Sequence, residues 1–240
     1  MRRSALTTLV LLVSLSNARA DSFKDCEQDT DVSLKLLGCA EIINRGTAKK
    51  EILASAYANR GNAYAEKDDL DRAIGDFDRA LDLNPNDAEV YTWRGEAYAN
   101  KGNLDRAIAD YDRAIGIDPY DAEGYTGRGD AYANKGDLER AIDDHSLAIK
   151  FDRKHAEAYI GRAWALFKAG KAADGLPDVE RALELERNDT AALNVRAHIF
   201  EALGRKEEAI ADYRKALSID PSIAASKDGL NRLGVSDPQT

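Results

Sequence analysis

The sequence is poor in the residues that build β-sheets, metal sites and phosphate sites. Aromatic residues make up 7% of its 240 residues, and there are only five prolines. Alanine, leucine and arginine, which lose little rotamer freedom in a helix, are abundant, so the composition favours an all-α fold. Without strands, no glycine-rich phosphate loop can follow one. His145, His155 and His198 lie too far apart in sequence for a metal cluster or a catalytic triad. We therefore expect no enzyme activity, no cofactor and no metal site.

Long apolar runs are also scarce. The one clear run, residues 5–15, follows Arg2 and Arg3 and precedes Ala18-Arg19-Ala20. This is the pattern of a secretory signal peptide spanning residues 1–20, with cleavage after Ala20. The run is shorter than the roughly 20 residues that a transmembrane helix needs. We expect a periplasmic or secreted protein. Export by the general pathway is favoured over twin-arginine export, because the arginine pair occurs alone.

Basic residues are outnumbered by acidic ones. Without the three arginines of the signal, the chain has 31 lysines and arginines against 43 aspartates and glutamates, a formal charge of −12. An acidic protein is a poor ligand for nucleic acid or for an anionic membrane surface. No later run reaches transmembrane length, so we expect a soluble protein that does not insert into a membrane.

Cysteine is rare, and both cysteines lie near the start of the mature chain, at Cys26 and Cys39. In an oxidising compartment, two nearby cysteines most often form a disulfide. A metal or redox site is the alternative, but the spacing is not C-x-x-C and no other soft ligand lies beside them.

The rest of the sequence is dominated by a repeat of 34 residues. The segment AYANKG occurs at 97–102 and again at 131–136. Small residues, aromatic residues and alanines recur in columns at the same interval, for example Gly61, Gly95 and Gly129, or Phe77 and Tyr111. His145, Val179 and Tyr213 continue the last of these columns. Periodicity at this length is typical of solenoid proteins.

These columns resemble the tetratricopeptide repeat. The resemblance covers residues 54–223 as five units, 54–87, 88–121, 122–155, 156–189 and 190–223. It implies an all-α, right-handed superhelical solenoid of antiparallel helix pairs. Solenoids need polar caps at their ends, and we assign these to residues 21–53, with a probable Cys26–Cys39 disulfide, and to a helix at 224–233. Within the first cap, 31–44 reads as the second helix of a degenerate unit. We expect residues 234–240 to be disordered.

Local signals agree with paired helices. In the second unit, Tyr91, Gly95 and Tyr98 share one helical face. Asp87 and Asp121 can cap the helices that follow them. The fourth unit departs from the pattern, because Pro177 lies where its second helix should already be running. We expect that helix to start late, near Asp174, and a local bend there.

Two charged columns repeat five times. One comprises Arg60, Arg94, Arg128, Arg162 and Arg196, and the other Asp76, Asp110, Asp144, Asp178 and Asp212. Our favoured hypothesis is a ladder of ion pairs that joins the two helices of each unit. The alternative is a row of arginines that binds a ligand.

The family resemblance also implies that the first helices line a concave groove, and it assigns binding positions within each unit. Carried over by position, the partner-binding candidates are Asn62, Glu66, Glu89, Thr92, Glu96, Asn100, Glu123, Thr126, Asp130, Asn134, Glu157, Trp164, Lys168, Asn194, His198 and Glu201. Phe167 adds apolar surface. Most of the charged candidates are acidic, so the groove should attract a basic partner. Trp164 is the strongest candidate, because aromatic anchors dominate binding energies, whereas Trp93 should pack between units.

Some members of the family hold a peptide carboxylate in a clamp of lysine, asparagine and arginine. The matching positions here carry Ser55, Ala58, Asn62, Glu89, Thr92 and Trp93, so that clamp is absent. The main hypothesis is an adaptor that binds a protein or peptide in an acidic groove, within an envelope or secretion-related assembly. The rival is a structural element that acts through its convex faces or by end-to-end self-association.

Overall fold

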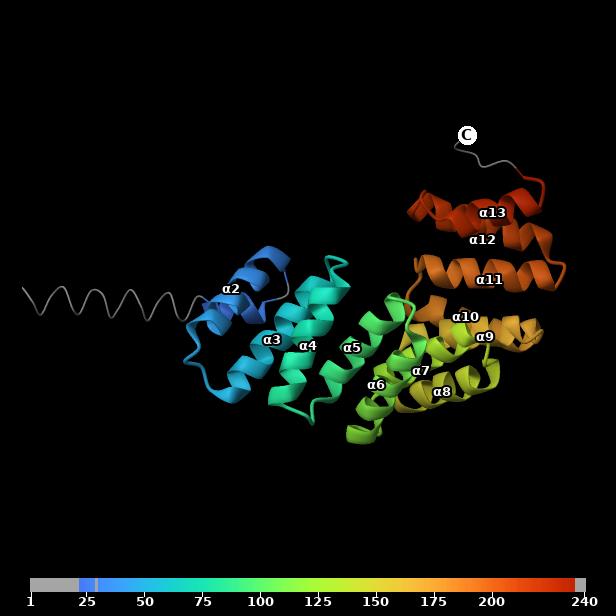
Figure 1. Cartoon of the computed structure of the whole chain (residues 1–240). Helices are drawn as coiled ribbons and strands as arrows, with labels where there is room; N and C mark the ends of the chain where they lie inside the picture. The colour runs from blue at the N-terminus through green and yellow to red at the C-terminus, as the bar shows by residue number, and fades with distance from the viewer. Residues whose placement is uncertain (1–21, 29, 236–240) are drawn as a thin grey trace, which may run out of the picture. The chain divides into compact units, whose positions relative to one another are not determined.

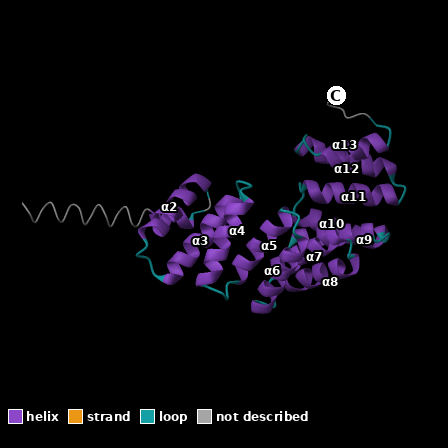
Figure 2. Ribbon diagram, in the orientation of Figure 1, coloured by secondary structure: helices purple, strands orange, loops and turns teal. Residues whose placement is uncertain are grey.

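The computed structural model describes residues 22–28 and 30–235. Every regular element in these ranges is a helix (Figures 1 and 2), so the all-α prediction is confirmed. None of these helices is both long and apolar enough to span a bilayer. The predicted signal, 1–20, and residues 236–240 of the predicted tail lie outside the described residues.

The chain divides into two compact units, Met1–Ile117 and Asp118–Thr240. The first contains a short helical segment at 22–27 followed by α2 (Val32–Arg45), α3 (Lys50–Ala65), α4 (Leu70–Leu83), α5 (Ala88–Asn100) and α6 (Leu104–Ile117). The second contains α7 (Ala122–Lys135), α8 (Leu138–Phe151), α9 (Ala156–Lys168), α10 (Ala172–Leu185), α11 (Thr190–Ala202), α12 (Lys206–Ile219) and α13 (Ala224–Arg232).

Within each unit, consecutive helices pack as hairpins, with α3 on α4 and α5 on α6 in the first unit. In the second unit α7, α9, α11 and α13 also touch one another in turn, whereas α8, α10 and α12 contact only their chain neighbours. The second unit therefore has one layer made of the first helix of each pair, here called the inner layer, and another made of the second helices, here called the outer layer.

Small residues on one helix face large ones on its partner, which lets the two backbones approach. A Cβ atom added at Gly95 would lie 2.9 Å from the ring of Tyr111, closer than real Cβ atoms come. The fourth pair reverses the arrangement, because a Cβ at Gly175 would lie 2.9 Å from the carbonyl oxygen of Ala163. The recurring small residues are thus explained by packing, which offsets the helix propensity lost at a mid-helix glycine.

Half of the labelled helices begin at an aspartate whose side chain accepts a backbone N–H. Asp87 accepts from Val90, and Asp121 accepts from Glu123, as expected from the sequence. The expectation for Pro177 was wrong, because α10 begins at Ala172, in register with the other second helices. Pro177 and Ala173 are both exposed. The Ala173 carbonyl that loses its helical donor therefore faces water, which reduces the cost of the proline.

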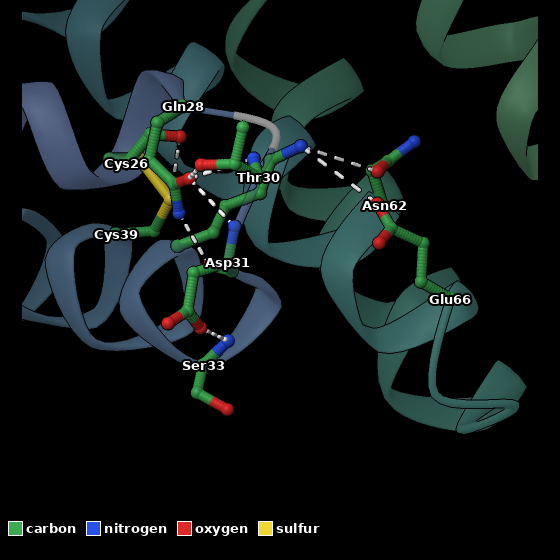
Figure 3. A network of polar contacts seen from close by, with 9 residues as sticks. Cys26, Gln28, Thr30, Asp31, Ser33, Cys39, Asn62 and Glu66 are labelled. Atoms are coloured by element: carbon green, nitrogen blue, oxygen red, sulfur yellow. Dashed lines mark hydrogen bonds and ion pairs between the residues drawn. A yellow bond between two sulfur atoms is a disulfide. The ribbon is translucent and has the colours of Figure 1, made fainter.

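The start of the described chain is held by a disulfide between Cys26 and Cys39. Both cysteines are buried, and the bond ties segment 22–27 to α2, which begins one residue after the predicted start. Figure 3 shows the polar network beside it, in which the side chain of Gln28 accepts the backbone N–H groups of Thr30 and Asp31. The short first segment is therefore fixed by the disulfide, by polar contacts and by a small apolar cluster in which Phe23 packs beside Cys26, Ile42 and Ala56.

The carboxyl end is more ordered than expected. Gly234 adopts a left-handed conformation with φ of 71°, and the N–H of Val235 donates to the carbonyl of Leu230 at 3.0 Å. Val235 also packs against the core around Leu217 and Leu230. This is a helix-ending motif sealed by an apolar contact, so the predicted tail begins at least two residues later than residue 234.

Candidate functional site

All five predicted arginine–aspartate pairs form. In each pair the arginine Nε and Nη2 atoms donate to the two carboxylate oxygens of an aspartate sixteen residues later. The donor–acceptor distances lie between 2.6 and 2.8 Å. The aspartates are buried, and the hydrogen bond to Asp76 raises the pKa of Arg60. The arginine columns therefore join the two helices of each pair, and the ligand-binding alternative is wrong.

Several predicted groove residues are occupied by structural contacts or buried. Thr92 and Thr126 are 2% and 5% exposed, and the Thr126 hydroxyl donates to the carbonyl of Ala122 one turn earlier. The assignment of both threonines to the binding surface is therefore wrong, because helix packing covers them. Asn62 accepts from the ammonium of Lys35 at 3.5 Å, and Glu66 lies 4.0 Å from the same group (Figure 3).

Glu201 is also committed to structure. Arg232 of α13 donates to its carboxylate at 2.7 Å, and the Tyr213 hydroxyl donates to the same group. Partial burial opposes ionisation of Glu201, but these two hydrogen bonds prevail and lower its pKa. Tyr213 is buried, and this raises its pKa. The network ties the last helix to α11 and α12.

The remaining polar candidates lie on the surface of the first helices. Trp93 packs against Phe77, with ring centroids 6.2 Å apart, as expected for a residue off the groove. The candidates that are exposed are Glu66, Glu89, Glu96, Asn100, Glu123, Asp130, Asn134, Glu157 and Lys168.

Five of the candidates come together around one hollow in the second unit. It has a volume of about 620 Å³ and lies on the inner layer, with walls from α7, α9, α11 and α13. The candidates that line it are Asp130, Glu157, Trp164, Asn194 and His198. The other lining residues are Ile160, Gly161, Asp189, Ala191, Val195 and Ala225.

One wall of the hollow is a cluster of rings. Trp164 stacks on Phe167 with centroids 5.3 Å apart, and the edge of His198 meets Trp164 at 5.7 Å. His198 is held in place because its Nδ1 lies 2.8 Å from the carbonyl oxygen of Asn194. Trp164 is half-buried. Its ring position is fixed before any ligand arrives.

Acidic groups form another part of the hollow. Desolvation by the surrounding walls, together with the nearby Glu157 carboxylate, raises the pKa of Asp130 to about 7. The Asp130 side chain is nevertheless 58% exposed, so its carboxylate is accessible to a ligand. Asp189 caps α11 through the N–H of Ala192 at 2.6 Å. A bound cation would relieve the repulsion between Asp130 and Glu157.

A buried histidine lies behind this acidic wall. His145 of α8 is fully buried, and its Nε2 lies 3.5 Å from an Asp130 carboxylate oxygen. Neither ring nitrogen has a hydrogen-bond partner among the described residues. Desolvation, reinforced by the positive charge of Arg162, lowers the pKa of His145 to about 4. The ring is therefore neutral at pH 7 and supplies no positive charge to Asp130.

Sequence reasoning placed His145 in the core but missed its contact with Asp130. It also left out Ile160 and Ala191, although both occupy positions that the family resemblance assigns to the groove, because only polar and aromatic residues were singled out. A search of those positions for apolar residues as well would have found both of them.

Models of the tetratricopeptide repeat match residues 58–122 and 160–222, and a further model of the same repeat matches 122–155. The matches cover more than half of the sequence. The chain belongs to the tetratricopeptide-repeat family. No curated protein sequence matches it.

Solved structures of tetratricopeptide-repeat proteins share this fold. A thermophilic protein of Thermus thermophilus is 23% identical, with a TM-score of 0.64 over 75% of this chain and 97% of that one. A protein of Parabacteroides merdae is 20% identical, with a TM-score of 0.67 over 95% and 94%. YrrB is 18% identical, with a TM-score of 0.57 over 80% and 97%. At these identities the likeness concerns the fold alone.

Proposed function

We propose that this tetratricopeptide-repeat chain is a binding scaffold that holds a segment of another protein against the inner helices of its second unit. Proteins of this family generally mediate protein–protein interaction, and YrrB is described as having an unusual peptide-binding site. The observation that carries the proposal is the hollow itself, which places a fixed tryptophan beside acidic side chains on a layer of first helices. Pre-positioned aromatic anchors bind at low entropic cost.

The bound segment is proposed to be basic. Of the hollow's lining residues, Asp130, Glu157 and Asp189 are acidic, and none is a lysine or an arginine. A negative hollow speeds the approach of a positively charged partner.

The site of action is proposed to be outside the cytoplasm, in an envelope or secretion-related assembly. The signal-like sequence of residues 1–20 supports export, and a disulfide between Cys26 and Cys39 suits an oxidising compartment. Mass spectrometry of the protein purified from the extracytoplasmic fraction should find a chain that begins at Asp21. A chain that retains residues 1–20 would contradict this part of the proposal.

Cross-linking and capture from the extracytoplasmic fraction test the binding role. The test variant is Asp130→Lys with Glu157→Lys, and the matched control is Glu139→Lys with Asp143→Lys, which makes the same charge change at exposed positions of outer helix α8. A partner that is lost with the first variant and retained with the second supports the proposal. Equal recovery would move the function to the outer faces or the ends, as the structural rival requires.

A further inference from the structure

We propose that the hollow in the second unit receives a single lysine side chain of the bound segment. The inference rests on the proposed function and specifies what the partner inserts. It begins with a contrast between the carboxylates of this chain. The five aspartates of the ladder each hold an arginine, for example Asp178 with Arg162 at 2.6 Å. Asp130 and Glu157 have no lysine or arginine within 4.0 Å in the part of the chain that the structure describes.

Two buried polar groups at the hollow also lack partners. His145 is fully buried, and its Nε2 points to Asp130 without completing a hydrogen bond. The side-chain oxygen of Asn194, a lining residue, is shielded from solvent and has no hydrogen-bond donor within the described residues. Buried polar atoms are rarely left unpaired in folded proteins. Two unpaired carboxylates, with unpaired buried polar atoms in the same walls, favour a ligand that brings several donors.

The arrangement of the acceptors distinguishes lysine from arginine. In the ladder, both oxygens of one carboxylate meet one guanidinium, which is the planar match that arginine requires. In the hollow the two unpaired carboxylates come from different helices, with Asp130 on α7 and Glu157 on α9. Separate acceptors around one space suit an ammonium, whose three donors point in different directions.

The apolar wall distinguishes a lysine side chain from a free terminal amine. Ile160, Trp164 and Val195 line the same hollow. They can cover the four methylene groups of a lysine stem while the ammonium reaches the carboxylates. A terminal amine has no such stem and would leave this wall in contact with water.

Trp164 also provides a built-in probe, because the chain has only two tryptophans and the other, Trp93, lies in the first unit. The indole N–H resonances would be assigned with Trp93→Phe and followed by NMR during titration. The probes are three peptides that are capped at both ends and contain one lysine, one arginine or one norleucine among alanines. A fourth alanine peptide with a free amino terminus tests the terminal amine.

The lysine peptide is expected to shift the Trp164 resonance and to leave that of Trp93 unchanged. One charge-assisted contact is worth about tenfold in affinity, so the uncharged norleucine peptide should bind at least about tenfold more weakly. The arginine peptide, with its planar guanidinium, and the free-amine peptide, with no methylene stem, should also bind more weakly than the lysine peptide. Glu157→Gln should weaken lysine binding by about tenfold, whereas Glu139→Gln on the outer helix should not. Equal binding of norleucine, tighter binding of arginine or of the free amine, or no shift of Trp164 would each overturn the proposal.

Acetylation of the captured partner separates this inference from the proposed function. If chemical acetylation of the partner's lysines abolishes capture, the lysine assignment is supported. If capture still depends on Asp130 and Glu157 but tolerates acetylation, the scaffold role stands and the lysine assignment fails.

Discussion

Two helix hairpins, α3–α4 in the first unit and α7–α8 in the second, share a framework and differ at its centre. Arg60 meets Asp76 in one, and Arg128 meets Asp144 in the other, with the same pairing of atoms. The central residue is Phe77 in the first hairpin and His145 in the second, both fully buried. The ion-paired framework is thus the same in both hairpins, and a substitution at a single position within it changes the chemical character of the buried centre.

The groove positions of the two hairpins differ in the same way. Asn62 in the first hairpin accepts from Lys35, whereas Asp130, two repeats later, faces the unpaired ring of His145. In the first hairpin, Lys35 of the same chain supplies a donor to Asn62. In the second, no lysine or arginine of the described residues pairs with the Asp130 carboxylate. This difference is what makes the second unit the better candidate for binding.

The largest expected effect comes from breaking the shared framework. Arg60→Ala should lower the free energy of unfolding by about 3 kcal/mol, because it leaves the buried Asp76 without its counter-ion. The double variant Arg60→Ala with Asp76→Ala should lose less than this single variant, since no charge is stranded. Urea denaturation of the chain lacking residues 1–20 measures both. A double variant that loses the sum of the two single losses would show that the pair is not coupled.

A reciprocal exchange at the centre of the hairpins should have the next largest effect. Phe77→His puts a polar ring into an apolar core and should cost about 2 kcal/mol. His145→Phe removes two unpaired nitrogens and should increase stability by about 1 kcal/mol, since the rings are similar in size. Thermal or urea unfolding of both variants checks the signs. A loss of stability in His145→Phe would mean that the histidine has a partner in solution.

Acid should change the stability of the α7–α8 hairpin through two groups with shifted pKa values, His145 and Asp130. The pKa of His145 is about 4 in the folded chain and near 6.5 when unfolded. Below pH 6.5 the unfolded chain therefore binds the extra proton, and stability falls as the pH drops toward 4. The pKa of Asp130 is raised to about 7, so the folded chain binds its proton first and stability rises as the pH drops from 7 toward 4. The two effects oppose each other over most of this range.

A variant that lacks either Asp130 or His145 should show the pH dependence of stability that the remaining residue causes. The charged or titratable groups that act on this pair within the second unit are Glu157, His155 and Arg162, and they are unchanged in both variants. Asp130→Asn should lose stability relative to wild type as the pH falls from 6.5 to 4.5, because the proton uptake by Asp130 that favours the folded wild-type chain is absent. His145→Phe should gain relative stability over the same interval. Difference curves from urea unfolding cancel the other carboxylates, and parallel curves for all three proteins would contradict the assignment.

The repeat predicted the helices, the caps at Asp87 and Asp121, and the arginine–aspartate ladder, because each depends on spacing along one hairpin. It did not predict that Thr92 and Thr126 are buried or that His145 faces Asp130. Those facts depend on how neighbouring helices are rotated against each other, and a rotation of one residue moves a side chain between core and surface. Periodicity therefore identifies the framework more reliably than the binding surface.

Pro177 provides the smallest and most specific test of this view. The sequence suggested that it delays α10, whereas the helix begins at Ala172 and both Pro177 and Ala173 are exposed. If the proline costs only one hydrated hydrogen bond, Pro177→Ala should raise the free energy of unfolding by less than about 1 kcal/mol. If it displaced the helix start, its removal would add a turn of helix and stabilise the chain by about 3 kcal/mol. Far-UV circular dichroism and urea unfolding distinguish these outcomes, because only the second includes a gain in helix content.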